Sequence, residues 1–183
     1  MLHNKPVRNP ATEEAAKFKI NVPVKEFLAA LRECSLSTSG HTQRQILQGV
    51  HIQALPTGII VLSKTNLETS VVARVQAEVS EPGVVVIPSA DMQRFLKYTD
   101  TELLTIKSTK SGVTLSTNNS SLDLNTENPD EFPLPTPLEG DEAKFHIEFD
   151  LLSSIFTRTH TYTDPNSSRY SLGNIQLSTT DGK

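Results

Sequence analysis

Apolar and polar residues follow one another along the chain in a pattern that occurs three times. A short apolar or alternating segment is followed by a proline or polar break and then by an amphipathic stretch. The segments are 18–22, 84–87 and 145–149, and the stretches are 24–34, 90–98 and 151–159. A period of two predicts a strand and a period of 3.6 predicts a helix. The segments begin 66 and 61 residues apart, which indicates a repeated supersecondary unit.

Each amphipathic stretch has one apolar face, which we expect to pack on a sheet. The apolar residues are Phe27, Leu28, Leu31 and Cys34 in the first, Met92, Phe95 and Leu96 in the second, and Leu151, Leu152, Ile155 and Phe156 in the third. Ser89 and Asp150 are the expected N-caps of the second and third helices, since short polar side chains bond the first free amides.

Further strands are predicted after each helix. They are 46–54, 59–64 and 69–79 after the first helix, 103–108, 113–117 and 120–126 after the second, and 170–178 after the third. The repeat is therefore β-α-β-β-β, and the fold class is α+β with antiparallel sheets. We expect a flexible tail at 1–17, a domain of two repeats at 18–141 and an incomplete half-domain at 142–183. The proline-rich stretch 129–137 and the acidic stretch 139–142 mark the boundary.

Composition narrows the class of protein. The chain has 183 residues, and its 17 basic against 21 acidic residues give a net charge of −4. This charge excludes a uniformly basic nucleic-acid coat but allows a basic face. The longest apolar runs are short, such as 84–88, so no membrane span is indicated. Residues 1–17 contain no apolar stretch typical of a signal peptide, and we expect a soluble cytoplasmic protein. The single cysteine excludes an internal disulfide framework and a multi-cysteine zinc site.

Candidate catalytic chemistry is sparse. The five histidines have no metal-ligand spacing, and His51 and His146 fall in strand patterns where exposed positions are expected. Cys34 lies on the apolar face of the first helix, so it is interpreted as a core thiol. Since neither paired carboxylates nor a nucleophile with its base is evident, we predict no enzyme, no metal and no cofactor.

Basic side chains recur on the predicted helices away from their apolar faces. They are Lys25 and Arg32 in the first, Arg94 and Lys97 in the second, and Arg158 in the third, with His160 beside it. For any single helix this pattern is typical of an ordinary solvated face. Stacked repeats would bring these faces to one side, and that surface would suit phosphate contacts without base readout.

Six segments carry a family resemblance: 18–31, 46–52, 62–69, 81–88, 128–135 and 169–173. In the third of them, Thr65-Asn66-Leu67-Glu68 stands where the family has Thr-Asp-Leu-Glu. In order and spacing, the segments resemble the bacterial DNA polymerase III beta subunit, the DNA sliding clamp, over 18–183.

The resemblance implies a ring of two three-domain subunits, with sheets outside and helices lining a DNA channel. It implies no catalysis. The ring encircles double-stranded DNA independently of sequence and tethers the replicative polymerase. The family's DNA-contact loops correspond to 35–45, with His41 or Arg44, and to the region of Asn166 and Tyr170. The pocket that recruits polymerase and clamp loader would follow Lys183, so the chain corresponds to an N-terminal portion of a clamp subunit.

Two readings from other classes are alternatives. A clamp-like interaction module could bind or poison a full-length clamp without encircling DNA. A small hydrolase or sugar-binding protein is the second, and the lack of a catalytic constellation counts against it.

Overall fold

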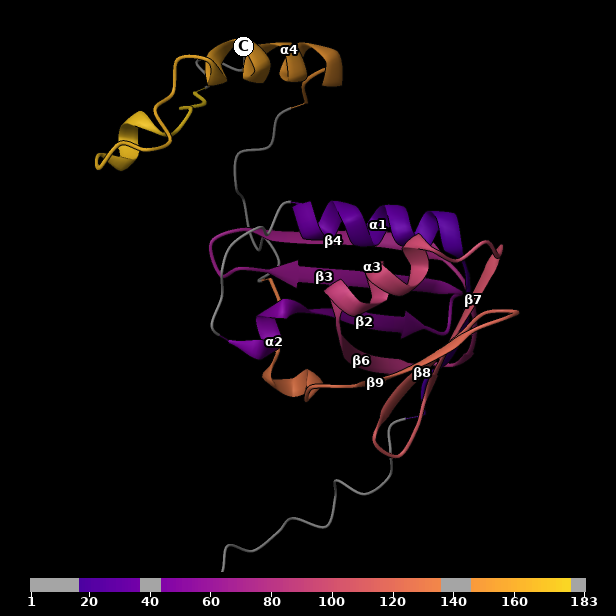
Figure 1. The fold of residues 1–183 in the computed structure, drawn as a ribbon. Coiled ribbons are helices and arrows are strands. Elements are labelled where there is room, and N and C mark those ends of the chain that lie inside the picture. Colours follow the sequence, from indigo (N-terminus) through magenta and orange to yellow (C-terminus); the bar gives the residue numbers. More distant parts are fainter. Residues whose placement is uncertain (1–16, 37–43, 136–145, 179–183) are drawn as a thin grey trace, which may run out of the picture. The chain divides into compact units, whose positions relative to one another are not determined.

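Two compact units make up the chain, an N-terminal unit, Met1–Thr136, and a C-terminal unit, Pro137–Lys183. The computed structural model describes residues 17–36, 44–135 and 146–178. In the described part of the N-terminal unit, two antiparallel sheets and the helices α1 and α3 enclose the core (Figure 1).

The elements of the N-terminal unit run in chain order through both sheets. They are β1 (Lys19–Pro23), α1 (Val24–Leu36), α2 (Gln45–Gln48), β2 (Gly49–Leu55), β3 (Ile59–Thr65), β4 (Ser70–Gln76), β5 (Glu78–Glu81), β6 (Gly83–Pro88), α3 (Ser89–Lys97), β7 (Leu103–Ser108), β8 (Gly112–Ser116), β9 (Ser121–Asn125) and the short 3-10 helix η2 (Pro129–Glu131).

The opening strand of each repeat lies in the sheet of the other repeat. The five-stranded sheet has the order β5-β1-β7-β8-β9, and the four-stranded sheet has the order β4-β3-β2-β6. Strand β1 thus pairs with β7 of the second repeat, with Pro23 opposite Leu103. Strand β6 pairs with β2 of the first repeat, with Pro88 opposite Gly49. The two repeats are therefore interlocked, and neither sheet is complete without the other repeat.

The last strand of each repeat bends back toward its own opening strand. After β4 the chain crosses at Ala77 into the other sheet, where β5 pairs with β1. After β9 the chain reaches β6 through a single bridge between Val86 and Glu127. The predicted strand 69–79 is therefore two strands in two sheets, which a periodicity of two could not reveal.

One apolar core joins both sheets and both helices. Among its completely buried members are Phe27 and Leu31 of α1, Met92 of α3, Ile20 of β1 and Ile106 of β7. The predicted apolar faces of the first two helices are confirmed, with Leu28 and Phe95 partly buried at the core's margin. Cys34 is completely buried, as predicted for a core thiol, and burial raises the pKa of its thiol.

Two details near the helix starts differ from the sequence predictions. The predicted strand 46–54 begins only at Gly49, because Gln45–Gln48 form the turn α2, which buries Leu47. Ser89 is not an N-cap, since Pro88 precedes the helix and the Ser89 hydroxyl instead donates to the Gln48 carbonyl at 2.9 Å.

A buried lysine, which the sequence reading missed, braces the same region. Lys64 of β3 is 8% exposed, and its Nζ donates to Ser89 Oγ at 2.6 Å. Desolvation lowers the pKa of this ammonium. The resulting chain of hydrogen bonds, from Lys64 through Ser89 to Gln48, ties β3 to the start of α3 and the end of α2.

The turn after β3 explains how asparagine replaces the aspartate of the Thr-Asp-Leu-Glu pattern. Asn66 Oδ1 accepts the backbone amides of Glu68 at 3.0 Å and Thr69 at 2.7 Å. A side-chain amide oxygen makes this Asx turn as a carboxylate would. The turn holds Leu67 at a φ of 75°, a conformation that most residues avoid.

The C-terminal unit differs most from the prediction. It holds the helix α4 (Phe149–His160) and the short 3-10 helix η3 (Tyr170–Leu172). The described residues of the expected strands at 145–149 and 170–178 form no strand. The N-cap of α4 is Glu148 rather than Asp150, and the apolar residues of this helix are half-buried or exposed. A strand needs a partner for its backbone hydrogen bonds, and the described part of this unit offers none.

No helix among the described residues is long and apolar enough to cross a membrane.

Replacing Ile20 with alanine is predicted to lower the free energy of unfolding by about 2–5 kcal/mol, because a completely buried side chain of β1 is lost from the interlocked core. The matched control is Val72→Ala on β4, where the side chain is 40% exposed and the change should stay within about 0.5 kcal/mol. Urea unfolding followed by circular dichroism measures both. Equal effects at the two positions would contradict the burial of Ile20 in the core.

Replacing Ser89 with alanine is predicted to lower the free energy of unfolding by about 1.5–3 kcal/mol, because the buried Lys64 ammonium loses its acceptor. Adding Lys64→Met to the same chain should recover most of this loss, since an apolar side chain of similar length needs no partner. A double-mutant cycle in urea provides the measurement. A Ser89→Ala protein as stable as the original chain would refute the bracing role.

Candidate nucleic-acid interface

Helices α1 and α3 lie next to each other on one face of the four-stranded sheet (Figure 1). Side chains also join them: Gln93 Nε2 of α3 donates to Ser35 Oγ of α1 at 2.7 Å. Ser35 Oγ in turn donates to the Leu31 carbonyl one helical turn earlier at 2.8 Å. The seam between the two helices is therefore held by a hydrogen bond above the apolar core.

The charges of α1 are sorted into two rows. Lys25 and Arg32 are two turns apart and lie on the side of the helix adjoining Leu28 and Ser35, which faces α3. Glu26 and Glu33 form the other row, which lines a cleft with residues 73–76 of β4. The helix has no net charge, but its basic row adjoins the seam and its acidic row faces away from it.

Helix α3 adds two cations and one acid. Lys97 lies one turn after Gln93, on the side toward α1, and Arg94 is exposed beside it. Asp91 lies one turn before Arg94 on the same side of the helix and pairs with it at 3.7 Å. Because the Arg94 side chain is 75% exposed, this pair contributes little to stability and leaves the guanidinium accessible.

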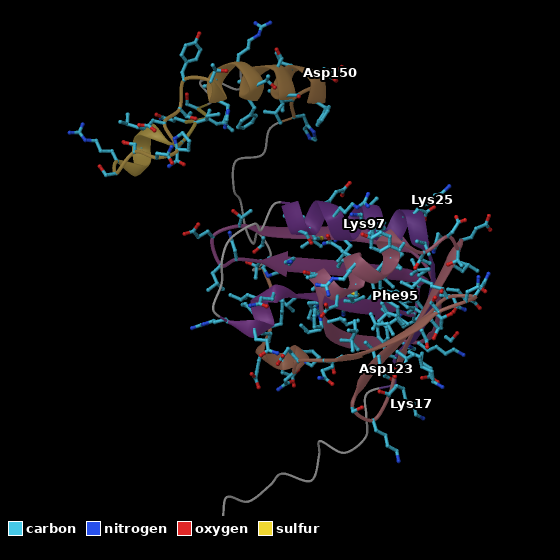
Figure 2. The ribbon with its side chains drawn as sticks, in the orientation of Figure 1. Lys17, Lys25, Phe95, Lys97, Asp123 and Asp150 are labelled. Carbon is cyan, nitrogen blue, oxygen red and sulfur yellow. The ribbon has the colours of Figure 1, made fainter. Side chains whose placement is uncertain are left out.

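Four predicted contact residues are thus brought together along the seam. We call Lys25, Arg32, Arg94 and Lys97 the basic strip; all four are exposed. Figure 2 shows Lys25 and Lys97 on the helix side of the unit, apart from Lys17 and Asp123. These four cations form a local positive region on a chain whose net charge is −4.

Tyr98 adds an aromatic ring to one end of the strip. It is the C-cap of α3 and is 79% exposed, and Lys97 Nζ lies 5.4 Å from the centre of its ring. Exposed tyrosine and basic side chains together suit contact with the sugars and phosphates of a nucleic-acid backbone. The sequence reading missed Tyr98, although its position off the apolar face and next to a lysine was a usable signal.

The predicted contact in the loop at 35–45 is only partly described. Arg44 is exposed at the N-cap of α2, and the other end of α2 meets the start of α3 through the bond between Ser89 and Gln48. Arg44 therefore belongs to an element adjoining α3. His41 lies outside the described residues.

The remaining predicted contacts belong to the C-terminal unit. Arg158 is exposed in the last turn of α4, where a cation also complements the helix dipole. Asn166 is exposed in a loop closed by the Asp164 amide, which donates to the Leu172 carbonyl at 2.9 Å. Tyr170 is the first residue of η3, which lies within the same loop. The exposed Arg169 directly precedes it and is a cation that was not predicted as a contact from the sequence.

No group of three or more histidine, cysteine or acidic side chains within the described ranges is placed to hold a metal ion. His51, predicted at an exposed strand position, is instead only 5% exposed. His146 is exposed but lies outside any strand.

Comparison with known proteins identifies the N-terminal unit. Residues 16–136 match the family model described as DNA polymerase III beta subunit, N-terminal domain. A comparison with curated proteins finds no match.

Solved structures show the same fold. The beta subunit of Thermotoga maritima is 26% identical with a TM-score of 0.61, covering 68% of this chain and 34% of its own length. The sliding clamp of Pseudomonas aeruginosa bound to griselimycin is 22% identical with a TM-score of 0.75, covering 85% of this chain and 42% of its own. The C. crescentus clamp is 15% identical with a TM-score of 0.77 and the same coverage.

The chain thus spans 34–42% of the length of these relatives. Its α+β fold with antiparallel sheets is confirmed as that of a sliding clamp. Together, the interlocked repeats and the match over 16–136 show that the chain belongs to the DNA polymerase III beta subunit family, the bacterial sliding clamps.

Proposed function

We propose that this chain contributes a sequence-independent DNA-binding surface to a polymerase processivity clamp, with the basic strip as its principal contact. The observation that carries the proposal is the placement of cations at the seam between α1 and α3. Lys25, Arg32 and Lys97 adjoin the seam, whereas Glu26 and Glu33 line the cleft on the far side of α1. Arg94 lies beside Lys97 in an exposed ion pair with Asp91.

The chemistry of the strip suits phosphates rather than base edges. Lysine and arginine side chains on flexible stems reach the duplex backbone, and each neutralised phosphate releases counterions. Four such contacts on an otherwise acidic chain give weak, salt-sensitive binding. Binding of this kind is appropriate to a protein that slides, because no register on the DNA is preferred.

The family supports a wider proposal for the complete assembly. Residues 18–141 would form the first domain of a ring subunit and 142–183 the beginning of the second. The helices would line a channel around duplex DNA, with a second subunit closing the ring in the cytoplasm at the nucleoid. The ring would then act by topology, keeping the polymerase at high effective concentration without catalysing a reaction.

Arg44, Arg158, Asn166 and Tyr170 complete the proposed DNA contacts, with His41 in the loop at 35–45. Arg158 and Asn166 are supported by their exposure, and the loop closed at Asp164 and Leu172 holds Asn166 close to Arg169. The polymerase and the clamp loader would bind parts of the family's subunit that this chain does not span.

Reversing charge in the strip is predicted to weaken DNA binding. The variant carries Arg32→Glu and Lys97→Glu, and fluorescence anisotropy with a short labelled duplex follows binding at low salt. Losing two phosphate contacts should lower the slope of log affinity against log salt by about 1.8, since each contact contributes about 0.9. Affinity should not depend on the sequence of the duplex.

The matched control is Lys107→Glu on the five-stranded sheet, which is exposed but lies on another element. An equal effect of the control would contradict a role for α1 and α3. If the original chain binds DNA independently of salt, or does not bind DNA, the result would instead favour the interaction module that binds a full-length clamp. In that case the chain should form a complex with added full-length clamp.

A further inference from the structure

A segment after β9 crosses the outer face of the four-stranded sheet. Its first contact is backbone pairing, with the Glu127 amide donating to the Val86 carbonyl at 3.1 Å. The turn η2 follows, where Asn128 Oδ1 accepts the Asp130 amide at 3.2 Å. Phe132 comes next and is only 5% exposed. This exit segment, residues 127–135, is the last part of the N-terminal unit that the structure describes.

Phe132 packs against His51 rather than against the main core. The ring centres are 5.3 Å apart and the rings are tilted by 35°. His51 lies on β2 between Val50 and Ile52, both members of the main core, so its side chain leaves the opposite face of the sheet. Val86 of β6, opposite His51 in the ladder, is completely buried and also lies outside the main core. The exit segment therefore covers a second small cluster.

A histidine at the centre of this cluster is chemically out of place. Its Nδ1 atom is buried, and no hydrogen-bond partner for it exists among the described residues. An unsatisfied buried nitrogen costs stability, whereas an aliphatic side chain of similar size would pack against Phe132 without that penalty. The position thus carries a titratable group where packing alone would favour leucine.

Burial opposes protonation of His51, because neither neighbour in the sheet carries a charge: Ser63 of β3 and Val86 of β6 flank it. Charged residues on the elements around it are Glu127, Asp130 and Glu131 of the exit segment, whose carboxylates would favour the imidazolium, and Arg44 before α2, which would oppose it. Burial lowers the pKa of His51 below its ordinary value of 6.5. A hydrogen bond with the backbone of His51 itself raises the pKa, but this effect is smaller.

We propose that His51 and Phe132 form a proton-sensitive clasp that fixes the segment through which the chain leaves the N-terminal unit. At neutral pH the uncharged imidazole lies beneath Phe132 and the exit segment stays on the sheet. Protonation places a cation in an apolar cluster, and its hydration requires the segment to lift away. Acid therefore loosens the path toward the C-terminal unit while the main core, on the other face of the sheet, stays intact.

The direction of the pH effect follows from linkage. A histidine with a lowered pKa in the closed state binds protons more readily in the open state. The closed state is therefore fully favoured above pH 6.5 and loses stability as the pH falls through the interval between 6.5 and the lowered value. Within that interval, each pH unit shifts the closing equilibrium by up to about tenfold.

Hydrogen exchange of the full chain, corrected for the intrinsic rate at each pH, tests the clasp. Between pH 7.5 and pH 5.0, the Glu127 and Phe132 amides should lose protection in the original chain. In His51→Leu, which keeps apolar packing on Phe132, their protection should not change with pH. The Thr117 amide, which donates to the Ser120 carbonyl in the turn between β8 and β9 of the five-stranded sheet, is the internal reference.

Equal loss of protection in both proteins, or no loss in either, would overturn the proposal. A direct titration of the His51 ring by NMR remains decisive should the leucine variant fail to fold. A pKa below 6.5 supports the clasp, and a value at or above 6.5 removes its physical basis.

Discussion

The interlocking of two opening strands is the constraint on which the N-terminal unit depends. Strand β1 completes the sheet of the second repeat and β6 completes the sheet of the first. Each helix begins directly after such a strand, α1 at Val24 and α3 at Ser89. The exchange of strands therefore sets where both helices start, and apolar burial then holds them side by side on one sheet.

The charge pattern matters only because of this packing. Neither helix is strongly basic, since Glu26 and Glu33 match Lys25 and Arg32 on α1. Placing α3 beside the face of α1 that carries Ser35 brings Lys97 next to the basic row of α1 and leaves Glu26 and Glu33 on the far side of α1. A surface with local positive charge thus arises on an acidic chain, without added charge, from the register of two helices.

The sequence predicted the parts of this arrangement that depend on local periodicity. The apolar faces of α1 and α3, the strands at 59–64 and 103–108 and the buried Cys34 all follow from spacing. The sequence could not predict the exchange of opening strands, because pairing between residues 29 to 39 or 80 to 88 positions apart leaves no local pattern. Periodicity also failed in the C-terminal unit, where alternating residues lack a partner strand among the described residues.

Side chains that run against their local pattern were the hardest to place. Lys64 and His51 are polar side chains, yet both are buried. Lys64 lies on the face of β3 that carries Ile60 and Leu62 and donates to Ser89, and His51 is covered by the ring of Phe132. In the candidate interface, the sequence indicated which cations belong to the helices. The separation of acids from bases became visible only once the neighbours of each helix face were known.

Amide chemical-shift mapping shows whether duplex DNA contacts the seam between α1 and α3. A short duplex is added at low salt to the isotopically labelled full chain. We expect shifts in residues of the basic strip and Tyr98 that disappear as salt is raised, with the five-stranded sheet unaffected. Shifts concentrated on Lys19 and Lys107 of that sheet, or none on α1 and α3, would contradict this contact.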